Sequence, residues 1–496
     1  MTPDVLVVGA GPVGLTMAAE LARYGVPVRI VDKAAQRTDK SKALVLWSRS
    51  LELFEPMGCA DTFVQAGVKV TGANIIAGGD QIAHISLETV ASPYPYALMI
   101  PQFDTERLME QHLNALGVCV ERQVEMTWFT AADEAVTAVL RHADGREETV
   151  ITPWLIGCDG AHSAVRHGLG MTFEGDTLPS DWILADVHLD GVPAPSDEIG
   201  VYWHADGILV IFPIKPGRYR VIADVGQTSA GEHRVDPTLE EVQAVLDRRG
   251  PGGVTASAPI WLAAFTINER KVADYSAGRV FLTGDAAHIH SPAGGQGMNT
   301  GMQDAINLAW KLALVVRESA EPEPLLGSYS LERSAVGHKV LEDAGHLTAL
   351  AMIRGRLLQG LRNHAAALVF GLAPVRHSMN AAMAELSIGY PDSPLTSTAG
   401  SHHGGPKAGE RAPVQAGAEP VGSGDTPRFA LFAPVDRESA ALIARHSDLL
   451  EPRPRPPFAD DGVWLVRPDG YVAMAASCDD WEDIDDFLQQ IADGPQ

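Results

Sequence analysis

The first 32 residues contain two short apolar runs separated by a glycine-rich turn and a helical stretch. Residues 5–8 read as a buried strand, the turn spans residues 9–14, and residues 15–24 follow with helical spacing. A second apolar strand over residues 26–31 ends at Asp32. This order of strand, tight turn, helix and strand predicts a βαβ unit.

Two later apolar strands, within residues 154–160 and 279–285, also lead into turns that carry glycine and aspartate. The stretch between them, about residues 172–270, contains strand-like runs at residues 208–212 and 219–222. Closely spaced runs of this kind suit an antiparallel sheet. We therefore predict a β-rich domain inserted between the two strand-and-turn signals.

Helical patterns follow after Gly301, first through Arg317 and then over residues 325–344. Residues 389–428 are crowded with glycine, proline and serine, which predicts a linker. A hairpin-like run at residues 462–474, with its turn at Pro468, Asp469 and Gly470, indicates a small domain at the C-terminal end.

The most membrane-like segment, residues 347–373, is interrupted by three arginines and a histidine, at Arg354, Arg356, Arg362 and His364. It therefore lacks the roughly 18 uncharged residues that a membrane span needs, and we predict a helix that is buried or faces a partner. The N-terminus has no signal-peptide pattern, so we expect a cytoplasmic protein without a membrane partner.

The composition is that of a multidomain globular protein, with 496 residues, 46% hydrophobic and 20% charged. A formal net charge of −25 disfavours nucleic-acid binding, so any anionic cofactor must be held by local dipoles. The four cysteines, at positions 59, 119, 158 and 478, are far apart in sequence. Their spacing predicts neither a disulfide framework nor a metal site.

The glycine-rich turn has the spacing of a dinucleotide-binding fingerprint, with Gly9, Gly11, Pro12 and Gly14 as expected cofactor contacts between a strand and a helix. Glycines at these positions let a pyrophosphate approach the helix N-terminus. Asp32, at the end of the next strand, is placed to accept hydrogen bonds from the ribose hydroxyls of an adenosine. The fingerprint predicts a dinucleotide and does not choose between FAD and NAD.

Two further motifs make that choice by resemblance. The first motif spans residues 157–166 and reads Gly-Cys-Asp-Gly-Ala-His-Ser-Ala-Val-Arg. The second is longer, spans residues 284–299 and reads Gly-Asp-Ala-Ala-His-Ile-His-Ser-Pro-Ala-Gly-Gly-Gln-Gly-Met-Asn. Together with the fingerprint they resemble the signatures of the group A flavoprotein monooxygenases, the aromatic hydroxylases with the fold of para-hydroxybenzoate hydroxylase. The resemblance covers about the first 345 residues.

The C-terminal part resembles that of the longer phenol and polyketide hydroxylases, through residues 409–413 and the turn Arg-Pro-Asp-Gly-Tyr at residues 467–471. Those proteins end in a thioredoxin-like domain. Thioredoxin chemistry needs a CxxC pair, and here Cys478 stands alone. We therefore expect this domain to pack or to mediate dimerisation rather than to act in redox chemistry, and a homodimer stays open.

The resemblance implies an α/β fold with a Rossmann-like FAD-binding domain, an inserted antiparallel β-sheet substrate domain and a thioredoxin-like C-terminal domain. The discontinuous FAD-binding domain is expected over residues 1–71, 101–171 and 272–345. The substrate-binding domain would take residues 72–100 and 172–271. A helical segment and linker over residues 346–400 would lead to the C-terminal domain at residues 401–496.

The resemblance also assigns site residues. Asp285 is expected to bond the ribityl chain of FAD, Lys42 a phosphate, and Gln102 the ribityl or phosphate region. Asp159 would help to position the pyrophosphate and a transiently bound NADPH or NADH, which Arg166 would also contact. The remaining expected FAD contacts lie next to the fingerprint acid, on a neighbouring strand and along the flavin ring: Lys33, Val124, Pro292, Gly295, Gly297, Met298 and Asn299.

The function implied by the resemblance is that of a single-component FAD-dependent monooxygenase. It would use NAD(P)H and O2 to hydroxylate a phenolic or polycyclic, polyketide-like aromatic substrate through a flavin C4a-hydroperoxide. Two alternatives stay open: a Baeyer–Villiger or ring-opening monooxygenase on the same fold, and a flavin-bearing protein that binds a ligand without turnover.

Substrate contacts are expected from the inserted sheet and from residues 72–100. Tyr202 and His204 flank Trp203 on a predicted strand, where they would orient a phenol or take its proton. The same pattern also suits polar residues on the exposed face of a half-buried sheet. We assign no catalytic base and no metal site, because His288 and His290 have no further ligand nearby in sequence.

Overall fold

The computed structural model describes residues 3–227, 234–292, 294–351, 372–399, 404–414 and 417–494, and the side chains of these residues except 346–351. The predicted buried or partner-facing helix over residues 347–373 lies mostly outside these ranges. Within them, no helix combines the length and the apolar character that crossing a bilayer requires.

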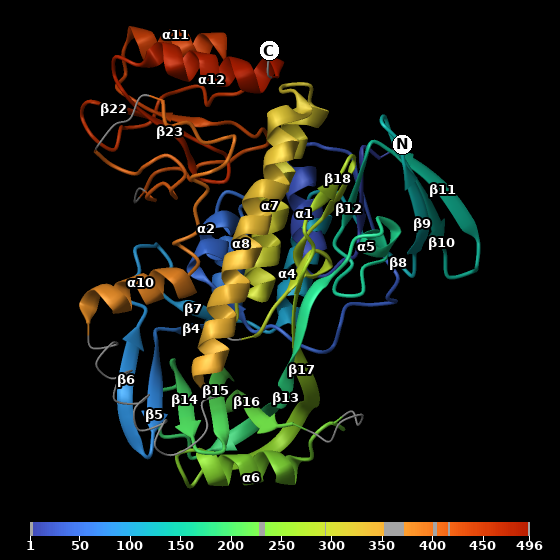
Figure 1. The fold of residues 1–496 in the computed structure, drawn as a ribbon, viewed down its shortest axis with the longest axis vertical. Helices are drawn as coiled ribbons and strands as arrows, with labels where there is room; N and C mark the ends of the chain where they lie inside the picture. The colour runs from blue at the N-terminus through green and yellow to red at the C-terminus, as the bar shows by residue number, and fades with distance from the viewer. Residues whose placement is uncertain are drawn as a thin grey trace.

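A six-stranded sheet forms the centre of the first part of the chain (Figure 1). Its strands β1, β2, β12 and β19 are parallel neighbours, so the carboxyl ends of all four meet at one edge. In spatial order the strands are β18 (Ser276–Ala277), β19 (Val280–Leu282), β12 (Trp154–Gly157), β1 (Val5–Val8), β2 (Val28–Asp32) and β8 (Glu121–Arg122). The predicted βαβ unit is confirmed, with helix α1 (Pro12–Arg23) between β1 and β2.

A larger sheet of eight strands lies below the first in Figure 1. Its strands come from two distant segments of the chain, which pair where β14 meets β5. In spatial order they are β20 (His288–Ile289), β17 (Thr255–Lys271), β13 (Glu174–Asp190), β16 (Arg218–Gly226), β15 (Gly207–Lys215), β14 (Glu198–His204), β5 (Gly72–Ala77) and β6 (Asp80–Ser86). Helix α6 (Leu239–Arg249) packs against one face.

Two three-stranded sheets complete this part of the molecule. One has the order β11 (Glu147–Thr152), β10 (Val136–Arg141) and β9 (Glu125–Ala131), and the other β3 (Val45–Leu46), β7 (Ala97–Met99) and β4 (Val68–Val70). Short helices accompany them: α2 (Ser48–Phe54), α3 (Ala60–Ala66), α4 (Gln102–Ala115) and α5 (Ala164–Gly168).

Helix α7 (Gly297–Val316) begins five residues before the start that the sequence pattern predicted. Its second turn includes Gly301, where an added Cβ would lie 2.7 Å from Val13 Cγ2 of α1. Gly297 and Gly301 weaken the helical pattern in the sequence, but Gly301 is needed because α1 and α7 pack closely there. The long helix α8 (Pro322–Ala351) then runs between α12 and β17, which it contacts (Figure 1).

The C-terminal part contains an antiparallel sheet of β21 (Ala430–Phe432), β22 (Gly462–Val466) and β23 (Val472–Ser477), with helices α11 (Arg437–Arg445) and α12 (Trp481–Asp493). The predicted hairpin is confirmed as β22 and β23. The prediction of a linker over residues 389–428 is wrong where the described part of this segment packs on the sheet. Ser397 forms a β-bridge with Met474, and Arg411 forms one with Tyr471. Glycine and proline prevent a regular strand there, but the backbone still pairs with β23.

Cys478 follows β23 and is half-buried. Burial, followed by the nearby carboxylates of Asp436, Asp461 and Asp479, raises the pKa of its thiol. A protonated lone thiol is a poor nucleophile. Changing Cys478 to Ser is therefore expected to leave the activity of the protein unchanged, and a correctly folded but inactive variant would contradict a non-redox role of the C-terminal part.

Candidate active site

The turns that follow β1, β2, β12 and β19 converge at the carboxyl edge of the six-stranded sheet. Gly9 has φ +102, and its N–H donates to Val31 O at 2.8 Å. A Cβ on Gly9 would lie only 2.4 Å from Cys158 O. The absence of a side chain therefore lets the turn after β1 pack directly on the turn after β12.

The N-terminus of α1 faces open space at one residue of the fingerprint. A Cβ on Gly14 would meet Gly9 O at 1.9 Å, whereas a Cβ on Gly11 would have no atom within 4 Å. Gly14 is thus required by packing within the protein, and Gly11 is not. The space beside Gly11, next to the unpaired N–H groups of the first turn of α1, fits a pyrophosphate.

The carboxylate of Asp32 is fixed beside this turn. Its Oδ2 accepts from Ala10 N–H at 2.7 Å, and its Oδ1 accepts from Ala34 N–H at 2.7 Å. Each oxygen keeps acceptor capacity for a ribose hydroxyl. The neighbouring Lys33 is exposed, and the buried Val124 donates its N–H to Asp32 O at 3.0 Å, so Val124 supports the strand end rather than presenting its side chain.

Asp159 and Arg166 join the second motif to the third. Asp159 Oδ2 accepts from Ala164 N–H at 2.6 Å, while its buried Oδ1 has no partner among the described residues. The Arg166 guanidinium is 2% exposed and donates to Ala286 O at 2.9 Å and to Ala161 O at 2.7 Å. Because Arg166 is engaged in this way, its predicted contact with NAD(P)H gains no support from the structure.

Asp285, Lys42 and Gln102 border the same region. Asp285 is exposed, yet surrounding protein atoms raise the pKa of its carboxyl, against the opposing effects of His288 and Lys42. Asp285 is therefore an accessible group among dense protein surroundings at the carboxyl edge, and we call the space that it faces the predicted flavin cleft. Lys42 is also exposed, whereas Gln102 is engaged: its Oε1 accepts from Ala43 N–H at 3.2 Å and its Nε2 donates to Glu106 at 2.9 Å.

The cleft position of Asp285 makes a direct test possible. Asp285→Ala is expected to weaken FAD binding at least about tenfold, the loss from one hydrogen bond to a charged acceptor. The ratio of flavin to protein absorbance after gel filtration measures the effect. The matched control is Asp274→Ala, which changes an exposed aspartate and is expected to keep full flavin. An Asp285→Ala protein with full flavin would contradict the ribityl contact.

The segment from Pro292 to Asn299 leads into α7, and Asn299 ties it to residues 45–50. Asn299 is fully buried; its Oδ1 accepts from Trp47 N–H at 2.9 Å, and its Nδ2 donates to Val45 O at 2.9 Å. The side chain of Asn299 therefore holds two backbone segments together. Pro292 is exposed, and Gly295, Gly297 and Met298 are half-buried, so these four line the accessible side of the segment.

Sequence reasoning missed two side chains that shape this region. The indole N–H of Trp47 donates to Gly294 O at 2.9 Å. Arg220, on β16, pairs with Asp186 at 2.8 Å and donates to the carbonyls of Ser41 and Lys42. In the sequence Trp47 cannot be told from an ordinary core residue. Arg220 could have been singled out, because an arginine within the predicted strand over residues 219–222 indicates a charged side chain in the sheet.

The predicted substrate contacts lie away from the cleft. Tyr202 is 4% exposed and packs in an apolar cluster with Leu209 and with Val242 and Leu246 of α6. His204 pairs with Asp206 in the turn after β14. Because side chains alternate along a strand, the neighbours of Tyr202 face the other way. The structure therefore gives no support to Tyr202 as a substrate contact.

The opposite face of the same strands is apolar and only partly covered. It presents half-buried side chains from three neighbouring central strands: Val201 of β14, Val210 and Phe212 of β15, and Ile222 of β16. Partly accessible apolar side chains in the middle of a sheet indicate room for an apolar ligand. We call this set the apolar sheet face.

Comparisons with known proteins agree with this geometry. The family profile described as "FAD binding domain" matches residues 2–344. The 6-methylpretetramide 4-monooxygenase of Streptomyces rimosus is 37% identical, over 95% of this chain and 90% of that protein. The pentachlorophenol 4-monooxygenase of Sphingobium chlorophenolicum is 33% identical, over 82% of this chain and 75% of that protein.

Among solved structures, the OxyS anhydrotetracycline hydroxylase from Streptomyces rimosus superposes with a TM-score of 0.81 at 28% identity. The match covers 100% of both chains, so it includes the C-terminal part as well as the two large sheets. The predicted α/β fold class is thereby confirmed.

Proposed function

Because the chain belongs to the family that carries this FAD-binding domain, and is an FAD-dependent aromatic monooxygenase with NAD(P)H as co-substrate, we propose that its substrate is a polycyclic phenol of polyketide type. The proposal includes the predicted domain boundaries and the FAD contacts at the carboxyl edge of the six-stranded sheet. A homodimer and a cytoplasmic location stay predictions from the sequence.

The residues at the carboxyl edge suit FAD. Gly11 leaves room at the N-terminus of α1, Asp32 offers acceptors beside it, and Asp285 lines the cleft between the turn after β19 and Lys42. FAD held by these residues would supply the chemistry by which NAD(P)H and O2 are used to transfer one oxygen atom to the substrate. The protein's part is to orient both reactants and to exclude water from the reacting groups.

The apolar sheet face carries the substrate proposal. On the α6 side of the same strands, Leu209 and Val221 are fully buried, whereas Val210 and Phe212 on the other side remain partly accessible. At one end of the face, Arg220 donates to the carbonyls of Ser41 and Lys42, which supports a position of this end next to the predicted flavin cleft. A flat aromatic ligand on this face would extend toward the flavin.

Helix α10 (Ala373–Met383) supplies an opposing wall. Met379 and Met383 pack against the cluster that includes Ile75 and Trp203 of the eight-stranded sheet. Methionine adapts its shape to irregular apolar ligands. Two apolar walls from different elements favour a large, flat, apolar substrate over a single small ring.

The comparison over nearly the full chain supports the same substrate class. Two of the proteins that match at least 90% of both lengths are named for 6-methylpretetramide and for anhydrotetracycline. The pentachlorophenol enzyme matches less of each chain. These names describe those proteins, and they favour a fused-ring substrate for this one.

The decisive experiment measures NAD(P)H oxidation by the purified flavoprotein with phenols of one to four fused rings. We expect fused-ring phenols to accelerate oxidation most and to gain one oxygen by mass spectrometry. Val210→Trp, which fills the apolar sheet face, is expected to raise the concentration for half-maximal stimulation roughly tenfold. Val235→Trp, at an 82% exposed position, is the control.

Two results would contradict the proposal in different ways. If single-ring phenols are the better substrates and Val210→Trp has no effect, the substrate class is wrong. If no aromatic compound accelerates NAD(P)H oxidation, the result would favour a flavin-bearing protein that binds a ligand without turnover.

A further inference from the structure

A buried glutamate links α10 to the first turns of α7. Glu385 follows the C-terminal end of α10, is 1% exposed and has φ +59, a conformation that non-glycine residues rarely adopt. Its Oε1 lies 3.2 Å from Thr300 Oγ1, and its Oε2 accepts from the Gln303 amide. Both partners belong to α7, directly after the segment that borders the flavin cleft.

The end of α10 is also fixed to other elements around the site. Gln296 donates its amide to Ala382 O at 2.9 Å, and Arg49 of α2 donates its backbone N–H to Ala384 O at 3.2 Å. On the sheet side, Asn380 donates to Ser86 O at 2.6 Å. The helix therefore bridges the flavin-side segment and the eight-stranded sheet.

The hydrogen-bond partners around Glu385 suit a protonated, neutral side chain better than an ionised carboxylate. The Thr300 hydroxyl has one proton, and its alternative acceptor is Gln296 O at 3.1 Å. An ionised carboxylate would then receive one or two donors where it accepts about four. The amide oxygen Oε1 of Gln303 is buried without a partner among the described residues and is the acceptor that a protonated Glu385 would use after an amide flip.

Charged groups around Glu385 act in opposite directions. Burial raises the pKa of Glu385 to about 8 against the hydrogen bonds from Thr300 and Gln303. The charge of Arg333 of α8 also opposes this change, and Asp304 of α7 adds to it. When the end of α10 leaves its place, Glu385 regains water and an ordinary pKa. Because the docked state holds the proton more tightly, docking is strongest at low pH and weakens as the pH rises from about 4.5 towards about 8.

We propose that Glu385 is a positioning residue that, as a neutral acid, docks α10 over the apolar sheet face. That the face covered by α10 is a substrate site rests on the proposed function, whereas the docking of α10 through Glu385 does not. The consequence is a substrate site that is closed more firmly below neutral pH than above it.

The test is hydrogen–deuterium exchange of the FAD-loaded protein without substrate, followed by mass spectrometry of peptides that cover α10. Measurements at about pH 6 and about pH 8.5, corrected for the intrinsic exchange rate, are expected to show a roughly tenfold to hundredfold loss of protection at the higher pH. Glu385→Gln, which cannot ionise, is expected to keep its protection at both pH values.

The matched control is Glu55→Gln, which removes a different carboxyl, half-buried, whose pKa is raised by burial and by Glu52. It is expected to show the same pH dependence as the wild type. Equal protection of wild-type α10 at both pH values overturns the proposal whether or not Glu385→Gln folds, and so does a Glu385→Gln protein that loses protection like the wild type. No aromatic ligand enters the experiment, so its outcome is independent of the substrate assignment.

Discussion

Replacing Arg467 with methionine is expected to lower the melting temperature of the FAD-loaded protein by roughly 3–5 °C, the result of a loss of about 3–5 kcal/mol. Arg467 is fully buried between the C-terminal part and α8. Its guanidinium donates to both oxygens of Glu332, at 2.6 and 2.9 Å, and to both oxygens of Asp469, at 3.0 and 2.6 Å.

The size of the expected effect follows from what the change leaves behind. Without Arg467, the buried carboxylates of Glu332 and Asp469 face Lys311, which lies 2.8 Å from Glu332. Burial lowers the pKa of Lys311 to about 8, against the opposing effect of Glu332, so its charge is itself held weakly. Burying a carboxylate without its partner costs far more than the loss of an exposed ion pair.

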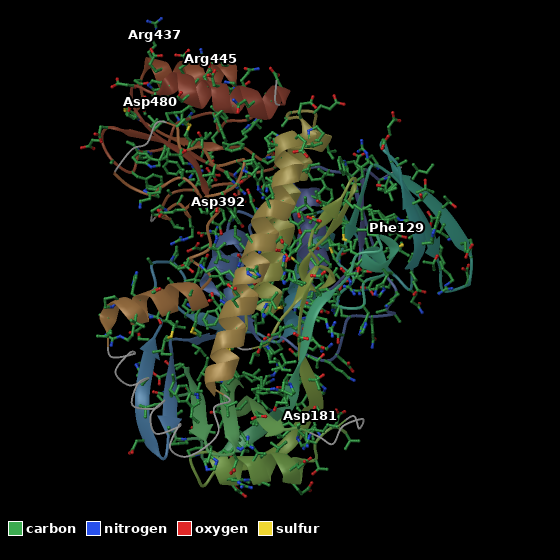
Figure 2. The ribbon with its side chains drawn as sticks, in the orientation of Figure 1. Phe129, Asp181, Asp392, Arg437, Arg445 and Asp480 are labelled. Carbon is green, nitrogen blue, oxygen red and sulfur yellow. The ribbon has the colours of Figure 1, made fainter. Side chains whose placement is uncertain are left out.

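Arg445→Met is the matched control, because it removes an arginine of the same C-terminal part that pairs with Asp485 while its side chain is 58% exposed. Figure 2 shows Arg445 on α11 at the outer surface of the molecule. Loss of an exposed pair is expected to change stability by less than about 1 kcal/mol. Equal melting temperatures for the two variants would mean that the buried network does not hold the C-terminal part in place.

The sequence was sufficient for the features that depend on neighbouring residues. The βαβ unit, the strands within residues 154–160 and 279–285, and the hairpin at Pro468 and Asp469 all follow from local periodicity and turn chemistry. Asp32 was identified from its place at the end of the second strand, and Asp285 from the family resemblance. The parallel order of β2, β1, β12 and β19 brings both to one edge.

Features that depend on contacts between distant residues were not accessible in this way. Arg467 was recognised as part of a turn, but its partner Glu332 lies on α8, 135 positions earlier in the chain. Tyr202 was assigned to the substrate side because its strand was recognised and its face was not. Which face of β14 meets α6 is decided by how the sheet packs, and the local pattern is compatible with both orientations.

Gly11→Ala is expected to reduce FAD affinity at least about tenfold while leaving the stability of the protein without FAD unchanged. Gly11 has φ −76, which alanine adopts readily, and its added Cβ would meet no atom within 4 Å. The methyl group would therefore occupy only the space assigned to the pyrophosphate. Losing one hydrogen bond to a charged phosphate, worth roughly 1.5–3 kcal/mol, corresponds to tenfold or more in Kd.

Gly14→Ala separates this effect from a general loss of folding. Its Cβ would lie 1.9 Å from Gly9 O, so α1 must move away from β1, and the protein without FAD is expected to melt at a lower temperature. Flavin fluorescence titration measures FAD affinity, and thermal unfolding without FAD measures stability. If Gly11→Ala bound FAD as tightly as the wild type, the open space at the N-terminus of α1 would not be the pyrophosphate site, and the cofactor would have to enter from another side of the carboxyl edge.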